Sequence, residues 1–285
     1  MVGNIKTYLS LIKFSHTIFA LPFALIGFFL AIKSQYTFRI DLFLLVILCM
    51  IFARSAAMAF NRYIDRHFDV LNPRTAVREI PSGMINAKNA LIFVFLNCLL
   101  FILSTWFINP ICFFLSPVAL FVVLFYSYTK RFTPLCHLVL GIGLALAPIG
   151  AYLAVTGVFD WLPLFFSFTV FFWVSGFDII YALQDEKFDK EHHLKSIPVL
   201  LGLKNALRVS KLLHICSVFF IILAGYYGHL DIFYWIGVTT FVGLLIYQHS
   251  LIKPTDLSKI NLAFFTANGI ASLLFALFTI ISFFK

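Results

Sequence analysis

Acidic residues recur at intervals of four at two places in this sequence of 285 residues. Asn61, Asp65 and Asp69 form the first series, and Asp185 and Asp189 form the second. Side chains four residues apart lie one above the other on the same face of a helix. Mg²⁺ prefers hard oxygen ligands and commonly takes one or two carboxylates together with phosphate oxygens of a substrate. We therefore predict that the four aspartates bind Mg²⁺, with Asn61 as a further oxygen ligand or as a group that orients them.

Basic residues are interleaved with both acidic series. A guanidinium pairs with two phosphate oxygens at once, whereas a lysine contributes a point charge. Most basic residues beside a membrane span serve topology, but Arg66 and Arg131 stand next to other polar groups directly at a span end. A site mouth with both acids and bases indicates a metal–diphosphate complex. The candidate phosphate-binding residues are Arg66, Arg74, Lys130, Arg131 and Lys195.

Asp178 lies within an apolar stretch, about two helical turns before Asp185. An ionisable side chain at membrane depth costs a few kcal/mol, so such residues usually mark a site or a pathway. The alternative is that Asp178 lies at the aqueous edge of its span, and we favour the functional role. Tyr126 and Tyr181 lie near the same mouths, where an interfacial aromatic belt is the alternative to substrate binding.

The composition defines the class of protein that must position these residues. Apolar residues make up 62% of the chain and charged residues 12%, against about 45–50% and about 25% in soluble domains. With a mean hydropathy of +0.99, the chain is predicted to be an integral protein of the lipid bilayer. A backbone in lipid must satisfy its own hydrogen bonds, which favours an all-α fold. We expect one polytopic domain over 1–285, and the net charge of +9 indicates membrane topology, not nucleic acid.

Apolar stretches long enough to cross a bilayer occur nine times. A transmembrane helix needs about 20 apolar residues. Only Asn109 and Pro110 separate the third span from the fourth, so these two must form a tight hairpin. We predict an all-α bundle of about nine spans with two pseudo-repeated acidic motifs, the spans being 14–33, 41–60, 89–108, 110–128, 137–156, 162–184, 206–227, 231–251 and 261–284.

Basic residues are distributed unequally between the two sides that nine spans define. Seventeen of the 21 lysines and arginines fall on one side, and only Lys33, Arg39 and Lys285 fall on the other; Arg54 lies within the second span. Cytoplasmic loops carry the excess of lysine and arginine. This bias predicts an inner (cytoplasmic) membrane protein whose amino terminus and active-site mouth are both cytoplasmic.

A short motif follows each acidic series at a similar distance. Ile80-Pro81 and then Lys88-Asn-Ala-Leu follow the first, and Ile197-Pro198 and then Lys204-Asn-Ala-Leu follow the second. Chance similarity in a low-diversity membrane sequence is the alternative. A true internal repeat would place the two acidic series opposite each other in a pseudo-symmetric bundle.

These motifs resemble the signatures of the UbiA superfamily of intramembrane prenyltransferases. The first signature, Asn-Asp-x-x-Asp-x-x-x-Asp, is matched except at Arg62, which stands in place of its first aspartate and leaves the number of metal ions open. The segment Tyr126–Thr133 is similar to the one that precedes the family's fifth helix. The second signature, Asp-x-x-Tyr-x-x-x-Asp-x-x-x-Asp followed by Lys-Ser, is matched by Asp178, Tyr181, Asp185, Asp189, Lys195 and Ser196.

Within that superfamily, 72–83 and 178–185 look most like the 4-hydroxybenzoate polyprenyltransferase branch, which includes UbiA-like enzymes of a menaquinone route. The resemblance implies transfer of a polyprenyl group from polyprenyl diphosphate to an aromatic acid in ubiquinone or menaquinone biosynthesis. The acceptor is 4-hydroxybenzoate or a dihydroxynaphthoate-type acid, and the sequence leaves this choice open.

The implied reaction assigns roles to the candidate residues. Loss of diphosphate needs stabilisation of negative charge, by Mg²⁺ on the four aspartates and by Arg66, Lys130 and Arg131. An apolar cavity keeps water from the allylic cation. Asp178 is expected to orient or deprotonate the acceptor. The expected substrate-binding residues are Asn61, Arg74, Tyr126, Tyr181 and Lys195.

Two other classes of membrane protein place acids on membrane helices. A cation-coupled transporter carries them along an ion path, but here they cluster on one side of the bilayer and no pair of broken helices is evident. A CDP-alcohol phosphotransferase needs an Asp-Gly-x-x-Ala-Arg run, which this sequence lacks. The transporter therefore remains the alternative to the prenyltransferase.

Overall fold

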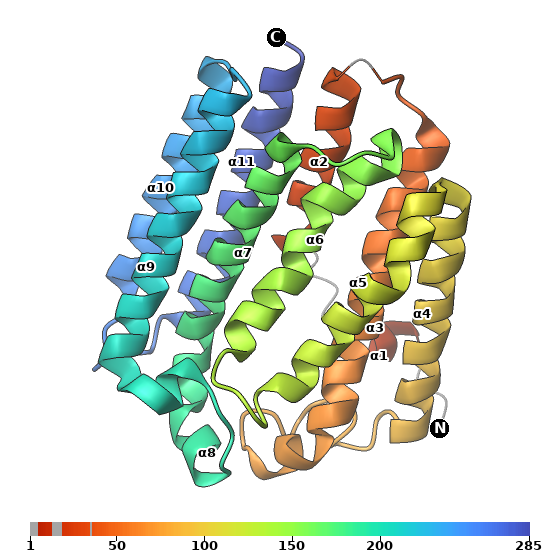
Figure 1. The fold of residues 1–285 in the computed structure, drawn as a ribbon. Helices are drawn as coiled ribbons and strands as arrows, with labels where there is room; N and C mark the ends of the chain where they lie inside the picture. Colours follow the sequence, from red (N-terminus) through yellow and green to blue (C-terminus); the bar gives the residue numbers. More distant parts are fainter. Residues whose placement is uncertain (1–4, 13–18, 35) are drawn as a thin grey trace.

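The computed structural model describes residues 5–12, 19–34 and 36–285, and these form a bundle of helices (Figure 1). The helices, with η2 a 3₁₀ turn and η3 a π-helix, are α1 (Ile5–Leu11), α2 (Leu21–Lys33), α3 (Ile40–Leu71), α4 (Ala87–Ile108), α5 (Pro110–Thr129), α6 (Cys136–Thr156), α7 (Trp161–Ala182), η2 (Leu183–Asp185), α8 (Glu186–Glu191), α9 (Ile197–Tyr227), α10 (Ile232–Leu251), η3 (Leu262–Ala267) and α11 (Asn268–Phe283).

Eight described helices are long and apolar enough to cross a membrane, which confirms the predicted class of all-α integral membrane protein. The first predicted span, 14–33, corresponds to the shorter apolar helix α2 of 13 residues. Residues 14–18 of that prediction lie outside the described residues. The predicted tight hairpin joins α4 to α5. Asn109 caps the start of α5, because its side chain accepts a hydrogen bond from the backbone of Cys112.

Helix α3 extends well past the predicted end of its span at residue 60. It continues through the first acidic series to Leu71, over 32 residues in all. Asn72 then adopts an extended backbone, as expected for a residue before proline. The first acidic series therefore lies on the last turns of a membrane helix, because its charged residues do not interrupt the helix and Pro73 does.

The second acidic series does not lie on one regular helix. Helix α7 ends at Ala182, the 3₁₀ turn η2 carries Asp185, and the short helix α8 carries Asp189. Helix α9 likewise begins earlier than the predicted span 206–227, and Gly202 interrupts it with a left-handed backbone (φ 72°). Gly83, between the first Ile-Pro pair and α4, also has a positive φ of 77°, so both copies of the short motif enclose a left-handed glycine.

Helices that hold the site approach each other closely at small residues. A Cβ atom on Gly141 of α6 would collide with the Ser175 hydroxyl and the backbone oxygen of Phe171 on α7. Gly176 of α7 is covered in the same way by the ring of His214 on α9. Small residues at such crossings allow the close packing that holds membrane helices together. The contact at Gly141 sets the spacing between α6 and α7.

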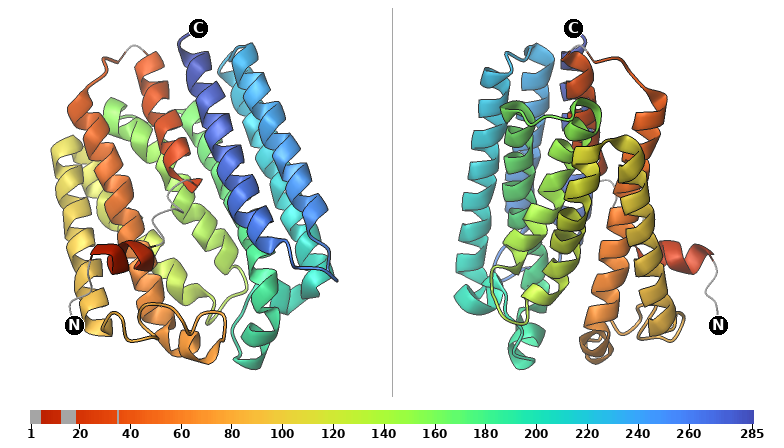
Figure 2. Two further views of the ribbon diagram at one scale, coloured as in Figure 1. Left: turned by 180° about the vertical axis from the view of Figure 1, so that it is seen from behind. Right: turned by 45° about the vertical axis from the view of Figure 1, so that its right-hand side comes forward.

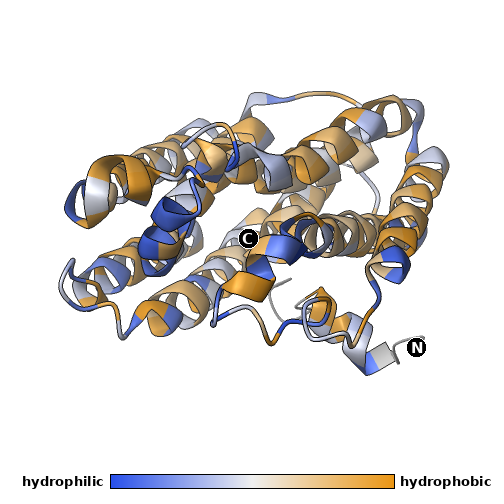
Figure 3. Ribbon diagram, turned by 90° about the horizontal axis from the view of Figure 1, so that it is seen from below, coloured by the Kyte–Doolittle hydropathy of each residue, from blue (hydrophilic) through white to orange (hydrophobic). Residues whose placement is uncertain are grey.

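The acidic series, α8 and the loop 72–86 all lie at one end of the bundle, opposite the C-terminus (Figures 1 and 2). Seen from that end, hydrophilic residues gather at the helix ends and in the loops, and hydrophobic helices form the body (Figure 3). The multiple spans make this an integral membrane protein.

Candidate active site

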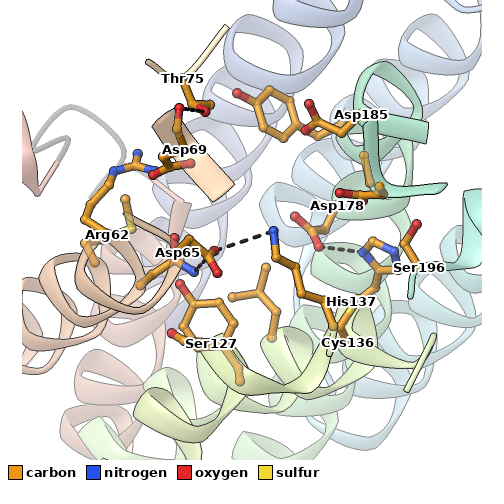
Figure 4. Close-up of a pocket in the computed structure, with 18 of the residues that line it drawn as sticks. Arg62, Asp65, Asp69, Thr75, Ser127, Cys136, His137, Asp178, Asp185 and Ser196 are labelled. Carbon is orange, nitrogen blue, oxygen red and sulfur yellow. Dashed lines mark hydrogen bonds and ion pairs between the residues drawn. The ribbon is translucent and has the colours of Figure 1, made fainter. Parts of the chain in front are cut away.

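Both acidic series line one cavity of about 280 Å³ at the polar end of the bundle (Figure 4). Residues 61–69 contribute from α3, and Asp185 and Asp189 contribute from the segment after α7. Helices α5 and α6 supply Lys130, which follows α5, and His137. The two series, more than 100 residues apart in the sequence, therefore face the same space.

Arg74 joins the two halves of the site. Its guanidinium forms a two-pronged ion pair with Asp185, with Nη2 2.6 Å from Oδ2 and Nε 3.0 Å from Oδ1. The Asn72 side chain also donates to Asp185, at 3.4 Å. Burial lowers the pKa of Arg74, but the Asp185 carboxylate outweighs this effect and the pKa is raised. Arg74 thus stays charged at the mouth of the cavity.

Cations also neutralise the first series. Asp65 lies 3.5 Å from Lys130 Nζ and 3.2 Å from Arg131 Nη2, and it accepts a hydrogen bond of 3.2 Å from the Asn61 amide. Asp69 pairs with Nη1 of Arg78 at 2.7 Å. These pairs mean that the carboxylates and the cations expected to hold a diphosphate contact one another directly.

Two carboxylates keep unused oxygen atoms. Asp69 Oδ2 is buried without a hydrogen-bond partner among the described residues. Asp189 is 7% exposed, and its carboxylate has no hydrogen-bond or ion-pair partner in the described chain. Within the described residues, no three acidic, histidine or cysteine side chains cluster closely enough to cage a metal. The donors are hard oxygens on two sides of one cavity, which fits Mg²⁺ shared with a substrate phosphate and not Mg²⁺ held by protein alone.

Two arginines face the cavity without a partner. Arg62 is 7% exposed, and Arg54, about two helical turns earlier on α3, is half-buried. Each has a buried Nε without a hydrogen-bond partner among the described residues. Neither guanidinium forms an ion pair with a described carboxylate within 4.0 Å. A buried unpaired charge is costly, so such groups usually await an anionic ligand. In the sequence, Arg54 stands out only as a charge within a span, and that location is the one feature that could have marked it as a site residue.

Asp178 of α7 lines the same cavity as the two acidic series (Figure 4). Its side chain is 23% exposed, and Oδ2 lies 2.7 Å from Nδ1 of His137, which is 3% exposed. His137 was not among the predicted site residues, because a single histidine at the start of a span carries no spacing signal. Its role becomes visible only when α6 packs against α7.

A second cavity of about 400 Å³ adjoins the first on its membrane side. Its lining is almost entirely apolar and comes from α3, α4, α5 and α6. The two cavities share Arg54, Met58, Tyr126, Leu140 and Leu144 as lining residues. A polar chamber therefore leads into an apolar one, and Arg54 stands at their junction.

The remaining predicted site residues divide into two groups. Tyr126, Tyr181 and Arg74 line the first cavity. Arg66 lies outside it, donates 2.6 Å to the backbone oxygen of Tyr63 and stacks on the Tyr63 ring. The Lys195 ammonium donates to the Phe132 backbone oxygen at 3.2 Å, so it links two loops.

The fold and the paired acidic series define a membrane prenyltransferase, and the chain belongs to the UbiA prenyltransferase family, whose model matches residues 20–270. The 4-hydroxybenzoate octaprenyltransferase of Tolumonas auensis is 33% identical to it over 226 residues, 78% of each chain. The enzyme of that name from Nitrosospira multiformis is 30% identical over 238 residues, 84% of this chain and 82% of its own.

Solved structures show the same fold. The apo UbiA homolog from Aeropyrum pernix K1 superposes with a TM-score of 0.84 at 31% identity, covering 93% of this chain and 97% of that chain. A UbiA homolog from Archaeoglobus fulgidus, bound to DMAPP and Mg²⁺, has a TM-score of 0.73 at 22% identity and covers 97% and 99%. At that identity the second likeness establishes the fold alone.

Proposed function

We propose that this prenyltransferase transfers a polyprenyl group from polyprenyl diphosphate to an aromatic acid, in a reaction that depends on Mg²⁺. The observation that carries this proposal is the polar cavity of both acidic series joined to an apolar cavity. A diphosphate with a long hydrocarbon tail needs both chambers. The acceptor we propose is 4-hydroxybenzoate or a dihydroxynaphthoate-type acid of quinone biosynthesis, as the names of the relatives suggest.

The diphosphate head would lie among the cations at the mouth. Arg74, Arg78 and Lys130 line the cavity there and are now paired with aspartates. Phosphate oxygens would take over these cations, and the released aspartates would share Mg²⁺ with the diphosphate. The residues that would hold Mg²⁺ are Asp65, Asp69, Asp185 and Asp189. Bound Mg²⁺ supplies positive charge that offsets the charge developing on the leaving group.

The polyprenyl tail would occupy the apolar cavity. Its walls of α3–α6 carry few polar groups, so burial of each methylene contributes about 0.8 kcal/mol. The same walls exclude water from the allylic carbon once the C–O bond to diphosphate has weakened. Water would otherwise compete with the aromatic ring for that carbon.

The aromatic acid would lie between the two chambers. Arg54, unpaired at the junction, would bind its carboxylate, since a guanidinium matches a carboxylate in two parallel hydrogen bonds. Asp178, across the cavity, would receive the ring proton. We place the site mouth on the cytoplasmic side of the inner membrane, because the loops at that end hold the excess of basic residues.

Purified protein in detergent provides the test. It is incubated with a labelled polyprenyl diphosphate, MgCl₂ and each of the two acids, and the mass of the product is measured. We expect one acid to gain the mass of the prenyl group, and we expect EDTA to abolish this product while excess MgCl₂ restores it. Transfer to neither acid would reject the proposed acceptor class, and transfer unaffected by EDTA would reject the role of Mg²⁺.

A further inference from the structure

His137 contacts Asp178, the residue proposed to receive the ring proton. It is 3% exposed, and Nδ1 of its ring lies 2.7 Å from Oδ2 of Asp178. The adjacent Cys136 side chain also interacts with the imidazole. Its other ring nitrogen, Nε2, is buried without a partner in the described chain. The hydrogen bond between His137 and Asp178 therefore connects α6 to α7 inside the cavity.

The contact gives the Asp178 carboxylate a hydrogen-bond partner on the neighbouring helix. An ionised carboxylate can only accept hydrogen bonds, so beside an ionised Asp178 it is Nδ1–H of His137 that donates to Oδ2. The charged pairs of the cavity involve Asp65, Asp69 and Asp185, and Asp178 has no arginine or lysine partner within 4.0 Å among the described residues. His137 thus supplies the positive or donor group that a carboxylate at membrane depth requires.

The backbone around His137 fixes the direction of its side chain. Gly141, one turn after His137 on α6, is in contact with Ser175 and Phe171 of α7. Ser175 in turn lies one turn before Asp178. The close crossing therefore holds the two helices at a spacing at which an imidazole reaches a carboxylate.

We propose that His137 is a positioning residue of the transfer reaction: it holds Oδ2 of Asp178, so that the second carboxylate oxygen faces the acceptor ring. This inference rests on the proposed function. Asp178 is the group that touches the acceptor, and His137 acts through it.

The chemical step is balanced without any further reactant. A ring carbon of the aromatic acid forms a bond to the first carbon of the prenyl group while the C–O bond to diphosphate breaks. The electron pair of that bond leaves with the diphosphate. The proton of the attacked ring carbon moves to the free oxygen of Asp178, the ring regains its aromatic electrons, and no atom is oxidised or reduced.

The test compares two replacements of His137. In His137→Asn the amide nitrogen takes about the place of Nδ1 and can still donate to Asp178, whereas His137→Leu removes the donor. We expect His137→Leu to lower kcat at least about tenfold, with KM for the polyprenyl diphosphate within about twofold of wild type. His137→Asn should recover most of this loss. The control is His229→Asn in the loop at the opposite end of the bundle, which should match wild type.

A second readout follows what becomes of the polyprenyl diphosphate. A misplaced carboxylate leaves the acceptor poorly held, so we expect His137→Leu to release more prenyl alcohol per prenylated acid than wild type does. Asp178→Asn should show the same shift, and adding His137→Leu to Asp178→Asn should change little further, because the two residues act as one unit. Melting temperatures of all variants in detergent identify any that do not fold.

The outcomes separate the two proposals. If wild type prenylates neither acid, the proposed function fails and this inference fails with it. If wild type is active but folded His137→Asn is no better than His137→Leu, or the two losses add fully with Asp178→Asn, the positioning role is wrong. A rise in KM for the donor equal to the fall in kcat would assign His137 to the diphosphate site and would also overturn the inference.

Discussion

At the scale of single residues, the charged side chains of the cavity differ in whether another side chain already pairs with them. Asp65, Asp69 and Asp185 pair with the cations beside them, whereas Arg54 and Arg62 have no hydrogen-bond or ion-pair partner in the described chain. Paired charges are satisfied by the fold itself. Unpaired ones cost free energy that a substrate can recover, so the unpaired arginines are the clearest residue-level evidence for anionic substrates.

Arg62 and Arg66 provide a matched comparison one turn apart on α3. Arg62 lines the cavity, and Arg66 is occupied with Tyr63 outside it. A hydrogen bond to a charged group contributes about 1.5–3 kcal/mol, so Arg62→Gln should weaken binding of the polyprenyl diphosphate about 10- to 100-fold. Arg66→Gln should stay within about twofold of wild type. Titration calorimetry of both variants checks this, and equal effects on binding would show that Arg62 does not contact the diphosphate.

At the scale of elements, helix crossings decide where the side chains meet. Helix α3 reaches past its predicted end and carries the first series on its last turns, and the break after α7 turns Asp185 and Asp189 toward it. Close contacts at glycine set the remaining distances. The site is therefore as sensitive to helix spacing as it is to its own side chains.

Glycines on two helices test this dependence on spacing. Gly141 of α6 is in contact with α7, whereas a Cβ atom on Gly243 of α10 would meet nothing within 4 Å. Gly141→Ala should destabilise the protein by about 1–3 kcal/mol through overpacking and should reduce transfer. Gly243→Ala should be neutral or stabilising by up to about 1 kcal/mol, because alanine favours the helix. Unfolding in detergent measures both, and equal stability would show that α6 and α7 can separate freely.

The apolar cavity between α3 and α6 makes a prediction about chain length. Gly143 lines it, and a Cβ atom there would meet only Val123, at 3.6 Å. Gly143→Leu should therefore fill the cavity without breaking the bundle and should lower activity with long donors more than with short ones. Leu212→Phe, on the exposed face of α9, is the control. A uniform loss across donors of increasing length would place the tail elsewhere.

For the whole molecule, the distribution of basic residues predicts the orientation in the membrane. The loop between α10 and α11 lies at the end that holds the site, and the loop between α6 and α7 lies at the other (Figure 1). In a cysteine-free background, Val158→Cys should react with an impermeant maleimide in intact bacterial cells. Ser258→Cys should react only after the membrane is opened. The reverse pattern would place the active-site mouth outside.

The sequence alone determined the class of protein, most of the spans and the residues of both acidic series. These features are local: hydropathy over about 20 residues defines a span, and a spacing of four defines a helix face. The ends of α3 and α7 were less predictable, because charged residues at a span end are compatible with a helix or a loop until capping and packing decide.

Only the tertiary structure decided which groups meet. Arg74 reaches Asp185 across 111 positions, and His137 reaches Asp178 across 41. No periodicity connects residues so far apart, since their distance depends on how whole helices cross. The same is true of Arg54 and Arg62: the sequence shows one within a span and the other in the first acidic series, but only the packed bundle shows that both face a cavity without a partner in the described chain.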